Sequence, residues 1–303
     1  MVKSLLFLVL AACTTASGDS KTKNDPHDPY DVVAKVPGRT PSFTDAAYTA
    51  HLRALETKLA KHGLSHLNIR VEDPFVVVGD GTVAQLERTS KTVRWAADKL
   101  EQDFFAKRPA KILDIYLFQT AATYEAGVAA LTDEKPSTPY GFYSPTQGAM
   151  FMNIATGGGT LVHEIVHPYV EADFPSAPTW LNEGLGSLFE QSSERDGHIV
   201  GLTNWRLAGI QKAIRRNDVP ALETLTAMTQ KQFYDSATSY GHARYLMYYL
   251  QEQGLLRRFY AAFRAARAKD PSGYATLVGI LGNADMRAFQ RTWEKYVGAL
   301  SFP

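Results

Sequence analysis

The first half of the chain alternates between helix-like and strand-like patterns of apolar residues. Apolar positions recur at intervals of three or four in three segments and predict helices over 42–63, 82–105 and 119–131. Shorter, denser apolar runs predict strand structure over 68–79, 110–118 and 140–155. The last run is interrupted at Ser144-Pro145, which predicts two short strands separated by a turn. A mixed layer of helices and strands is therefore expected in this half.

The pattern changes from Leu202 onward. Helical spacing dominates there, and no strand pattern of comparable strength occurs. Helices are predicted over 205–216, 219–228, 238–253, 255–268 and 284–299. A mixed half followed by an all-helical half predicts a fold of the α+β class.

Composition excludes some classes of function. The chain has 303 residues, of which 45% are hydrophobic and 21% charged, as expected of a globular protein with a substantial core. Its 32 Lys and Arg residues nearly balance 31 Asp and Glu residues, for a formal net charge of +1. This balance, without any long basic run, argues against nucleic acid as a partner.

The first residues, MVKSLLFLVLAAC, combine a charged start with a short apolar run that ends in small residues. The run is shorter than the ~20 residues needed to span a bilayer and is typical of a secretory signal. Its end, Leu10-Ala11-Ala12-Cys13, resembles the lipobox of bacterial lipoproteins. This resemblance implies cleavage before Cys13 and acylation of its thiol, which would anchor the protein to the cell envelope. Thr14 after the cysteine favours the outer membrane. The alternative is an ordinary cleaved signal with a chance cysteine.

These features suggest four consecutive parts. Residues 1–13 are the predicted lipoprotein signal peptide, and the polar, Pro-rich residues 14–42 predict a flexible tether. A mixed α/β subdomain is expected over 43–159. Residues 160–303 then hold a candidate metal site and the helical subdomain.

The segment HEIVH brings together chemistry that zinc enzymes use. His163 and His167 are four residues apart, so on a helix they point about 40° apart and lie about 6 Å apart along the axis. Both imidazoles would then face one point, with Glu164 beside it. This geometry suits two zinc ligands and an adjacent general base. The alternative is a pair of core or surface histidines without a metal.

A catalytic zinc site needs a third protein ligand and an open position. The downstream run Trp180-Leu181-Asn182-Glu183-Gly184, together with HEIVH, resembles the gluzincin metallopeptidases. The resemblance covers roughly residues 140–300. It implies a zincin-like fold and a single zinc ion held by His163, His167 and Glu183. It also implies that Glu164 is the catalytic base and that the substrate is a protein or peptide.

Two departures from the gluzincin pattern concern the second helix. Ser187 stands where some gluzincins carry an aspartate behind the first histidine. Glu190 lies on nearly the same helical face as Glu183 and is a candidate replacement, the alternative being an exposed surface residue. The connection between the two helices is short, and Pro175 and Pro178 are expected to end one helix and begin the next.

Two further local features flank the histidines. Pro168 removes a hydrogen bond to the carbonyl of Glu164, so a kink or tightening is expected just after His167. The glycines at 157–159 lack the Lys-Ser/Thr that a phosphate-binding loop would place after them, so they predict a turn from strand to helix.

Gluzincins commonly stabilise the oxyanion with a Tyr or His from a later helix. The resemblance makes Tyr240 and His242 the candidates, with Tyr240 preferred. Tyrosines at helical spacing are otherwise typical of a core or groove stripe. The segment GAMFMNIA, at 148–155, is expected either to be an edge strand that pairs with an extended substrate or to be an ordinary buried strand.

Three hypotheses for the function result. The first is a lipid-anchored, single-zinc metallopeptidase that hydrolyses peptide bonds in the cell envelope. The second is a catalytically idle zinc-binding lipoprotein that serves as a protein-binding module. The third is a structural lipoprotein in which the motif is incidental. The presence of Glu164 beside the three candidate ligands favours the first.

Overall fold

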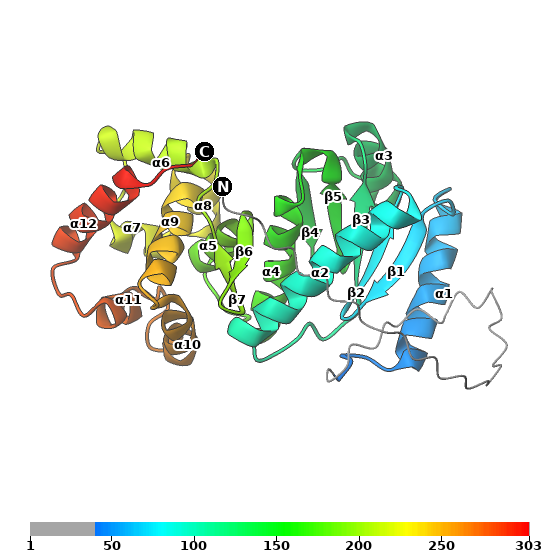
Figure 1. Ribbon diagram of the computed structural model, residues 1–303, viewed down its shortest axis with the longest axis horizontal. Coiled ribbons are helices and arrows are strands. Elements are labelled where there is room, and N and C mark those ends of the chain that lie inside the picture. Colours follow the sequence, from blue (N-terminus) through cyan, green and yellow to red (C-terminus); the bar gives the residue numbers. More distant parts are fainter. Residues whose placement is uncertain (1–39, 303) are drawn as a thin grey trace, which may run out of the picture. The chain divides into compact units, whose positions relative to one another are not determined.

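A five-stranded sheet forms the centre of the first half of the fold (Figure 1). The computed structural model describes residues 40–302, so the predicted signal, Cys13 and most of the predicted tether lie outside the described residues. The strands are β1 (Asn68–Glu72), β2 (Phe75–Gly79), β3 (Leu113–Phe118), β4 (Gly141–Ser144) and β5 (Ala149–Asn153). Their order is β1-β2-β3-β5-β4, with β2, β3 and β5 parallel and the two outer strands antiparallel to their neighbours.

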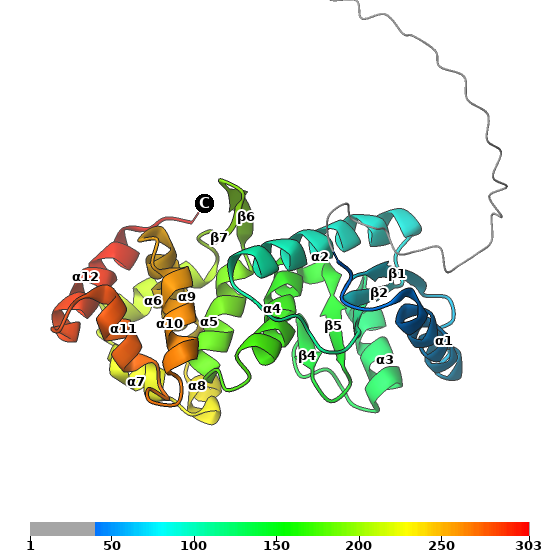
Figure 2. The same ribbon diagram turned by 90° about the horizontal axis from the view of Figure 1, so that it is seen from below.

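Helices cover both faces of this sheet (Figure 2). They are α1 (Asp45–Lys61), α2 (Val83–Asp103), α3 (Ala121–Thr132) and α4 (Gly159–Asp173). Successive side chains of a strand point to opposite faces, and β3 shows this plainly. Ile115 packs in the core shared with α2 and α4, whereas Asp114 accepts a hydrogen bond of 2.7 Å from His51 of α1. Phe118 contacts Tyr124 of α3 on the same side as Asp114.

The strand before the candidate metal helix is not at the sheet edge. β5 pairs with β3 on one side and with β4 on the other, and all its residues are buried. The expectation of an edge strand over 148–155 is therefore wrong, because the residues from Gly141 to Ser144 fold back and occupy that edge. The alternative of an ordinary buried strand is confirmed, and β4 is the edge strand at this end of the sheet.

Helices α4 and α5 (Thr179–Phe189) follow the sheet and pack against each other. As expected, the connection between them is short: α4 ends at Asp173, and Pro178 is the N-cap of α5. Helix α4 continues through Pro168 for a further turn, so the proline does not end it. Before α4, the single 3₁₀ turn η1 (Ile154–Thr156) and Gly157, with φ of +109°, make the predicted change from strand to helix.

A small hairpin that sequence analysis missed comes after α5. Its strands are β6 (Ser192–Arg195) and β7 (His198–Gly201), and Asp196 and Gly197 join them with positive φ angles of 54° and 80°. This Asp-Gly pair is a typical two-residue hairpin turn. The region that begins at residue 160 is therefore not purely helical.

From residue 202 to 302 the described secondary structure is helical, as predicted. The helices are α6 (Arg206–Arg215), α7 (Leu222–Ala227), α8 (Gln230–Asp235), α9 (Ser239–Glu252), α10 (Leu256–Ala266), α11 (Tyr274–Leu281) and α12 (Met286–Ala299). The short helices α8 and α11 were not predicted. One hydrophobic core runs from the sheet through α4 and α5 into these helices. Within residues 40–302, no helix has both the length and the apolar character that crossing a membrane requires.

Candidate metal centre

Helix α4 presents three potential ligands on one side. The candidate ligand atoms of His163, Glu164 and His167 all lie within 4.8 Å of one another. The two imidazole rings are 4.9 Å apart between centroids. All three residues are mostly buried, so the motif lies inside the fold and not on an exposed helix face. The expected convergence of the histidine side chains is present.

Glu183 approaches from helix α5. Its Oε2 atom lies 3.3 Å from Nε2 of His163, and the residue is only 6% exposed. Helix α5 packs directly against α4, and this packing brings the WLNEG segment to the histidines. Of the three candidate ligands from the sequence, His163 and His167 thus converge on α4 beside Glu164, and Glu183 meets the ring of His163 from α5.

Both histidines are oriented by a hydrogen bond at Nδ1, the ring nitrogen that does not face Glu183 or Glu164. Nδ1 of His163 lies 3.1 Å from Oε1 of Glu190, and Nδ1 of His167 lies 3.0 Å from Oδ1 of Asn182. Carboxylate and amide oxygens only accept, so each Nδ1 must carry the proton in these hydrogen bonds. In a neutral imidazole, Nε2 then keeps its lone pair. This arrangement of partners is what zinc-ligating histidines usually have.

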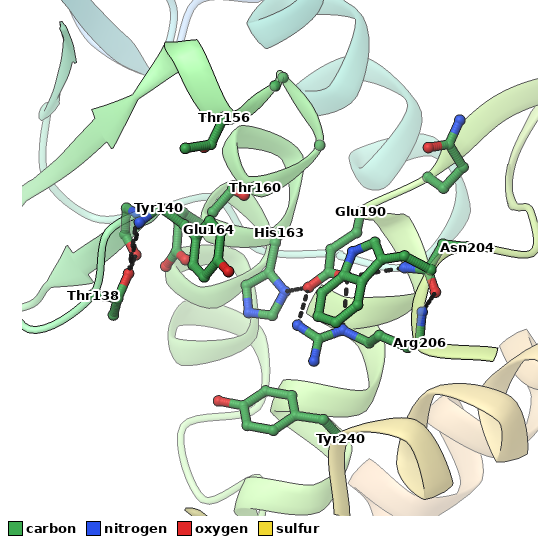
Figure 3. A pocket seen from close by; sticks show the side chains of 16 residues that line it. Thr138, Tyr140, Thr156, Thr160, His163, Glu164, Glu190, Asn204, Arg206 and Tyr240 are labelled. Atoms are coloured by element: carbon green, nitrogen blue, oxygen red, sulfur yellow. Dashed lines mark hydrogen bonds and ion pairs between the residues drawn. The ribbon is translucent and has the colours of Figure 1, made fainter. Parts of the chain in front are cut away.

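Glu190 is held in place by a network of its own (Figure 3). Arg206 donates to it from Nε and Nη2 at 2.8 and 2.6 Å, and Asn204 donates from Nδ2 at 3.0 Å. Behind Asn204, the fully buried Arg244 donates from Nε to Oδ1 of Asn204 at 2.8 Å. Glu190 therefore occupies the position behind the first histidine that Ser187 leaves without a carboxylate.

Glycines of the second helix allow this close packing. A Cβ atom on Gly186 would lie 3.1 Å from three atoms of the His163 ring. A Cβ atom on Gly184 would lie 3.3 Å from Ala243 and from Met247 of α9. Such distances are tighter than ordinary van der Waals contact, so a larger residue would move the histidine or separate the helices. Packing thus explains why glycine occupies positions 184 and 186.

The two oxygens of the Glu183 carboxylate differ in their partners. Tyr234 of α8 donates its hydroxyl to Oε1 at 2.9 Å. The other oxygen, Oε2, is buried and lies 3.3 Å from Nε2 of His163, within ion-pair distance of that ring when it is protonated. A buried carboxylate oxygen without a partner is costly unless a cation faces it. Imidazole nitrogens and carboxylate oxygens are among the atoms that zinc takes as ligands in proteins.

The carboxylates around His163 favour a positive charge on its ring. Burial opposes the charged form of His163, but the carboxylates of Glu183 and Glu190 outweigh it and raise the pKa of His163 to about 10. Burial likewise opposes the ionisation of Glu183. The imidazoles of His163 and His167 outweigh this effect, so the pKa of the Glu183 carboxyl group lies below its usual range. Glu183 is therefore an anion at neutral pH.

The side chain of Glu164 extends from α4 to the edge strand β4. Its Oε2 accepts a hydrogen bond of 2.9 Å from the backbone N–H of Tyr143 in β4 and lies 3.7 Å from Nε2 of His167. Glu164 lines a cavity of about 660 Å³, together with His163 and residues from four other segments. The carboxylate thus faces open space beside the candidate ligands.

Of the two candidate oxyanion donors, only Tyr240 reaches this cavity. Figure 3 shows its ring below His163. Burial, followed by the charge of Glu183, raises the pKa of Tyr240 well above its usual range, so its hydroxyl stays protonated. His242 is fully buried, and its ring packs 4.9 Å from that of Trp293. Neither ring nitrogen of His242 has a hydrogen-bond partner within the described residues, and burial lowers its pKa to about 3.

The structure thus does not bring His242 to the candidate site. Residues two apart on a helix point about 160° apart, so the sequence indicates that Tyr240 and His242 cannot both face the site but not which of them does. Sequence reasoning missed Asn182 as a partner of His167, although Asn182 lies within the quoted motif, and it missed Tyr234 and Arg206, which had no local signal. No family model matches the chain, and no curated protein matches it either.

Proposed function

We propose that this chain is a zinc-dependent metallopeptidase of the gluzincin type. One zinc ion would be held by His163, His167 and Glu183. The observation that carries this proposal is the buried Oε2 of Glu183, which lies 3.3 Å from Nε2 of His163 while Nδ1 of the same ring is bonded to Glu190. Without a metal, a proton on Nε2 of His163 balances this carboxylate, and a zinc ion would take the place of that proton with His167 as a further ligand.

The arrangement of the elements supports a zincin-like fold as part of this proposal. The sheet ends in the antiparallel strand β4, helix α4 carries the two histidines beside it, and α5 brings the glutamate. The chain's resemblance to gluzincins in HEIVH and WLNEG points to the same fold.

A bound zinc ion would supply Lewis acidity, lowering the pKa of a coordinated water toward ~7 and polarising a substrate carbonyl. Glu164 would accept the proton of the attacking water and pass it to the leaving amine. Its position between the candidate ligands and the cavity suits this role. The backbone N–H of Tyr143 would hold one carboxylate oxygen while the other remains available.

Tyr240 would donate its hydroxyl hydrogen to the oxyanion that develops on the attacked carbonyl. Its place on the cavity wall and its raised pKa, which keeps the hydroxyl protonated, support this role. Glu190 and Asn182 would hold each ring with its remaining proton on Nδ1, so that Nε2 of each histidine is directed to the ion when zinc is bound.

The cellular setting of the proposed reaction is the bacterial cell envelope, with a lipid anchor on Cys13 and the outer membrane preferred. This part rests on the resemblance of the first 13 residues to a lipoprotein signal. A Cys13→Ser variant is expected in the soluble fraction of cells. Unchanged membrane association of that variant would contradict acylation as the anchor.

A cleavage assay separates the peptidase from the idle zinc-binding alternative. Zinc-loaded protein is incubated with a mixed peptide library, and products are identified by mass spectrometry. Wild type is expected to cleave, and Glu164→Gln is expected to lose at least about 100-fold in rate, because general-base catalysis typically contributes that much. The control is Glu125→Gln, which changes an exposed glutamate of α3 outside the cavity lining. Equal rates for wild type and Glu164→Gln would remove the proposed role of Glu164.

A further inference from the structure

Exposed aromatic rings flank the candidate site on two sides. Among residues 40–302, few large hydrophobic side chains are exposed, and both Tyr140, at 53%, and Trp205, at 61%, line the cavity that holds His163 and Glu164. Exposed aromatic rings that line a cavity commonly mark a surface where a ligand binds.

The two rings belong to opposite ends of this cavity. Figure 3 shows Tyr140 on one side of Glu164 and Arg206 on the far side of His163. Trp205 stays with Arg206, because the guanidinium carbon of Arg206 lies 4.3 Å from the centroid of its indole ring. A chain that crosses the catalytic groups would therefore meet one aromatic ring before them and the other after them.

Hydrogen bonds fix the backbone that carries each of the two rings. The carbonyl of Tyr140 accepts a hydrogen bond of 2.9 Å from the N–H of Asn153. Trp205 stands between Asn204 and Arg206, which are joined by a hydrogen bond of 3.0 Å from the Arg206 N–H to the side chain of Asn204. Since the backbone is fixed before anything binds, a ligand that stacks on these rings pays little to order them.

The charged side chains that line the cavity already have hydrogen-bond partners. Arg206 gives Nε and Nη2 to Glu190, and Glu190 also accepts from His163. Glu164 is assigned to the reaction itself. The rest of the lining consists of glycine, threonine, amide and aromatic residues. The charged groups of the lining are therefore not available to bind a charged substrate side chain, whereas the rings of Tyr140 and Trp205 are exposed.

We propose that the site takes peptides with bulky apolar or aromatic side chains on both sides of the scissile bond. Trp205 contacts the side chain on one flank, and Tyr140 contacts the side chain on the other. The proposal rests on the peptidase function proposed above and adds its substrate class. Each ring acts on a separate flank, so the two preferences are independent.

The test uses zinc-loaded protein and fluorogenic peptides that vary one flanking residue at a time among Phe, Leu, Ala, Lys and Glu. Wild type is expected to prefer Phe or Leu over Ala by about tenfold in kcat/KM at each flank, and to disfavour Lys and Glu. Trp205→Ala is expected to remove the preference at one flank only, and Tyr140→Ala at the other. Val83→Ala, which alters an exposed residue of α2 outside the cavity lining, is the control.

Zinc content and melting temperature are measured for every variant, and Trp205→Phe, which keeps an aromatic ring, is expected to retain most of the preference. Cleavage by wild type without an apolar preference, or a preference unchanged by both alanine variants, would overturn the proposal while leaving the peptidase function intact. Inhibition by an oligosaccharide that depends on both rings, with no peptide preference, would also overturn it. The absence of any peptide cleavage would instead refute the underlying function.

Discussion

The Nδ1 atom of His167 lies 3.0 Å from Oδ1 of Asn182. This contact joins the two halves of the motif, because helix α5 orients the second histidine of α4 through the residue just before the candidate ligand Glu183. Glu190 does the same for His163 at 3.1 Å. Helix α5 and its C-cap residue Glu190 thus supply one candidate ligand and both histidine partners.

Removing the Asn182 acceptor is expected to weaken zinc binding. Asn182→Ala should lower zinc affinity about 10- to 100-fold, as loss of a partner behind a metal-bound histidine commonly does. Asn182→Asp keeps an oxygen acceptor and should retain most of the affinity. Competition with a fluorescent zinc chelator measures both constants. Equal affinities for wild type and Asn182→Ala would show that this hydrogen bond does not orient His167 for a metal.

Gly186→Ala is expected to damage the site through contact with His163. The added methyl group would lie 3.1 Å from three ring atoms, so the imidazole must move. Zinc affinity should fall at least about tenfold, in the range seen when a ligand's support is lost. Gly209→Ala on α6 is the control, because its Cβ would meet no atom within 4 Å. Gly209→Ala should leave zinc affinity unchanged and stabilise the fold by about 0.5–1 kcal/mol. An undiminished affinity in Gly186→Ala would contradict the packing argument.

Two tyrosines near Glu183 are expected to differ in their effects. Tyr234→Phe removes the 2.9 Å hydrogen bond to Oε1 of Glu183, so it should weaken zinc binding about tenfold and leave kcat of fully loaded enzyme nearly unchanged. Tyr240→Phe should lower kcat by about 100-fold, as loss of an oxyanion donor does, with zinc affinity unchanged. Titration with zinc and steady-state kinetics on the same preparations separate the two. The reverse result would exchange the two roles.

The stability of the metal-free protein is expected to depend on the protonation of His163. Its pKa is raised from 6.5 to about 10, so the stabilising contribution of the charged ring is complete below about pH 6.5 and is lost as pH rises toward 10. The melting temperature in EDTA should therefore fall over this interval. It should fall less in Glu183→Gln, where one of the carboxylates that raise the pKa is gone.

The zinc-loaded protein should show the opposite trend, because zinc binding requires His163 to lose its proton. The difference in melting temperature between zinc and EDTA samples should grow with pH over the same interval. Parallel pH profiles for the two samples would contradict an ion at His163.

Much of the fold follows from local patterns. The long helices α1 and α2 and the buried strands β2, β3 and β5 all fall inside predicted segments, because their apolar spacing is set by core packing. The hairpin of β6 and β7 was missed because β6 consists of the polar residues Ser-Ser-Glu-Arg and is mostly exposed, so it has no apolar pattern, although Asp196-Gly197 is a turn signal. Helix α8 was missed because Phe233 is its only buried residue, which leaves no apolar spacing to recognise.

Prediction of the site depended on whether its contacts are local. His163 and His167 share one helix, so their spacing alone predicts their convergence. Glu183 was found through its motif. Arg206 and Tyr234 reach the site from later segments, and their contacts depend on how α6 and α8 pack against α5. No spacing within the sequence encodes that packing, and the same holds for the occupation of the sheet edge by β4.

A zinc ion at His163, His167 and Glu183 can be seen in a crystallographic anomalous-difference map, collected at the zinc absorption edge from protein prepared with one equivalent of zinc. We expect a single strong peak bonded to Nε2 of His163, Nε2 of His167 and a carboxylate oxygen of Glu183, with distances of about 2.0–2.2 Å. The peak should be absent in a His163→Ala crystal. No peak among these three side chains in the wild-type crystal, or a peak elsewhere only, would refute the proposed zinc site.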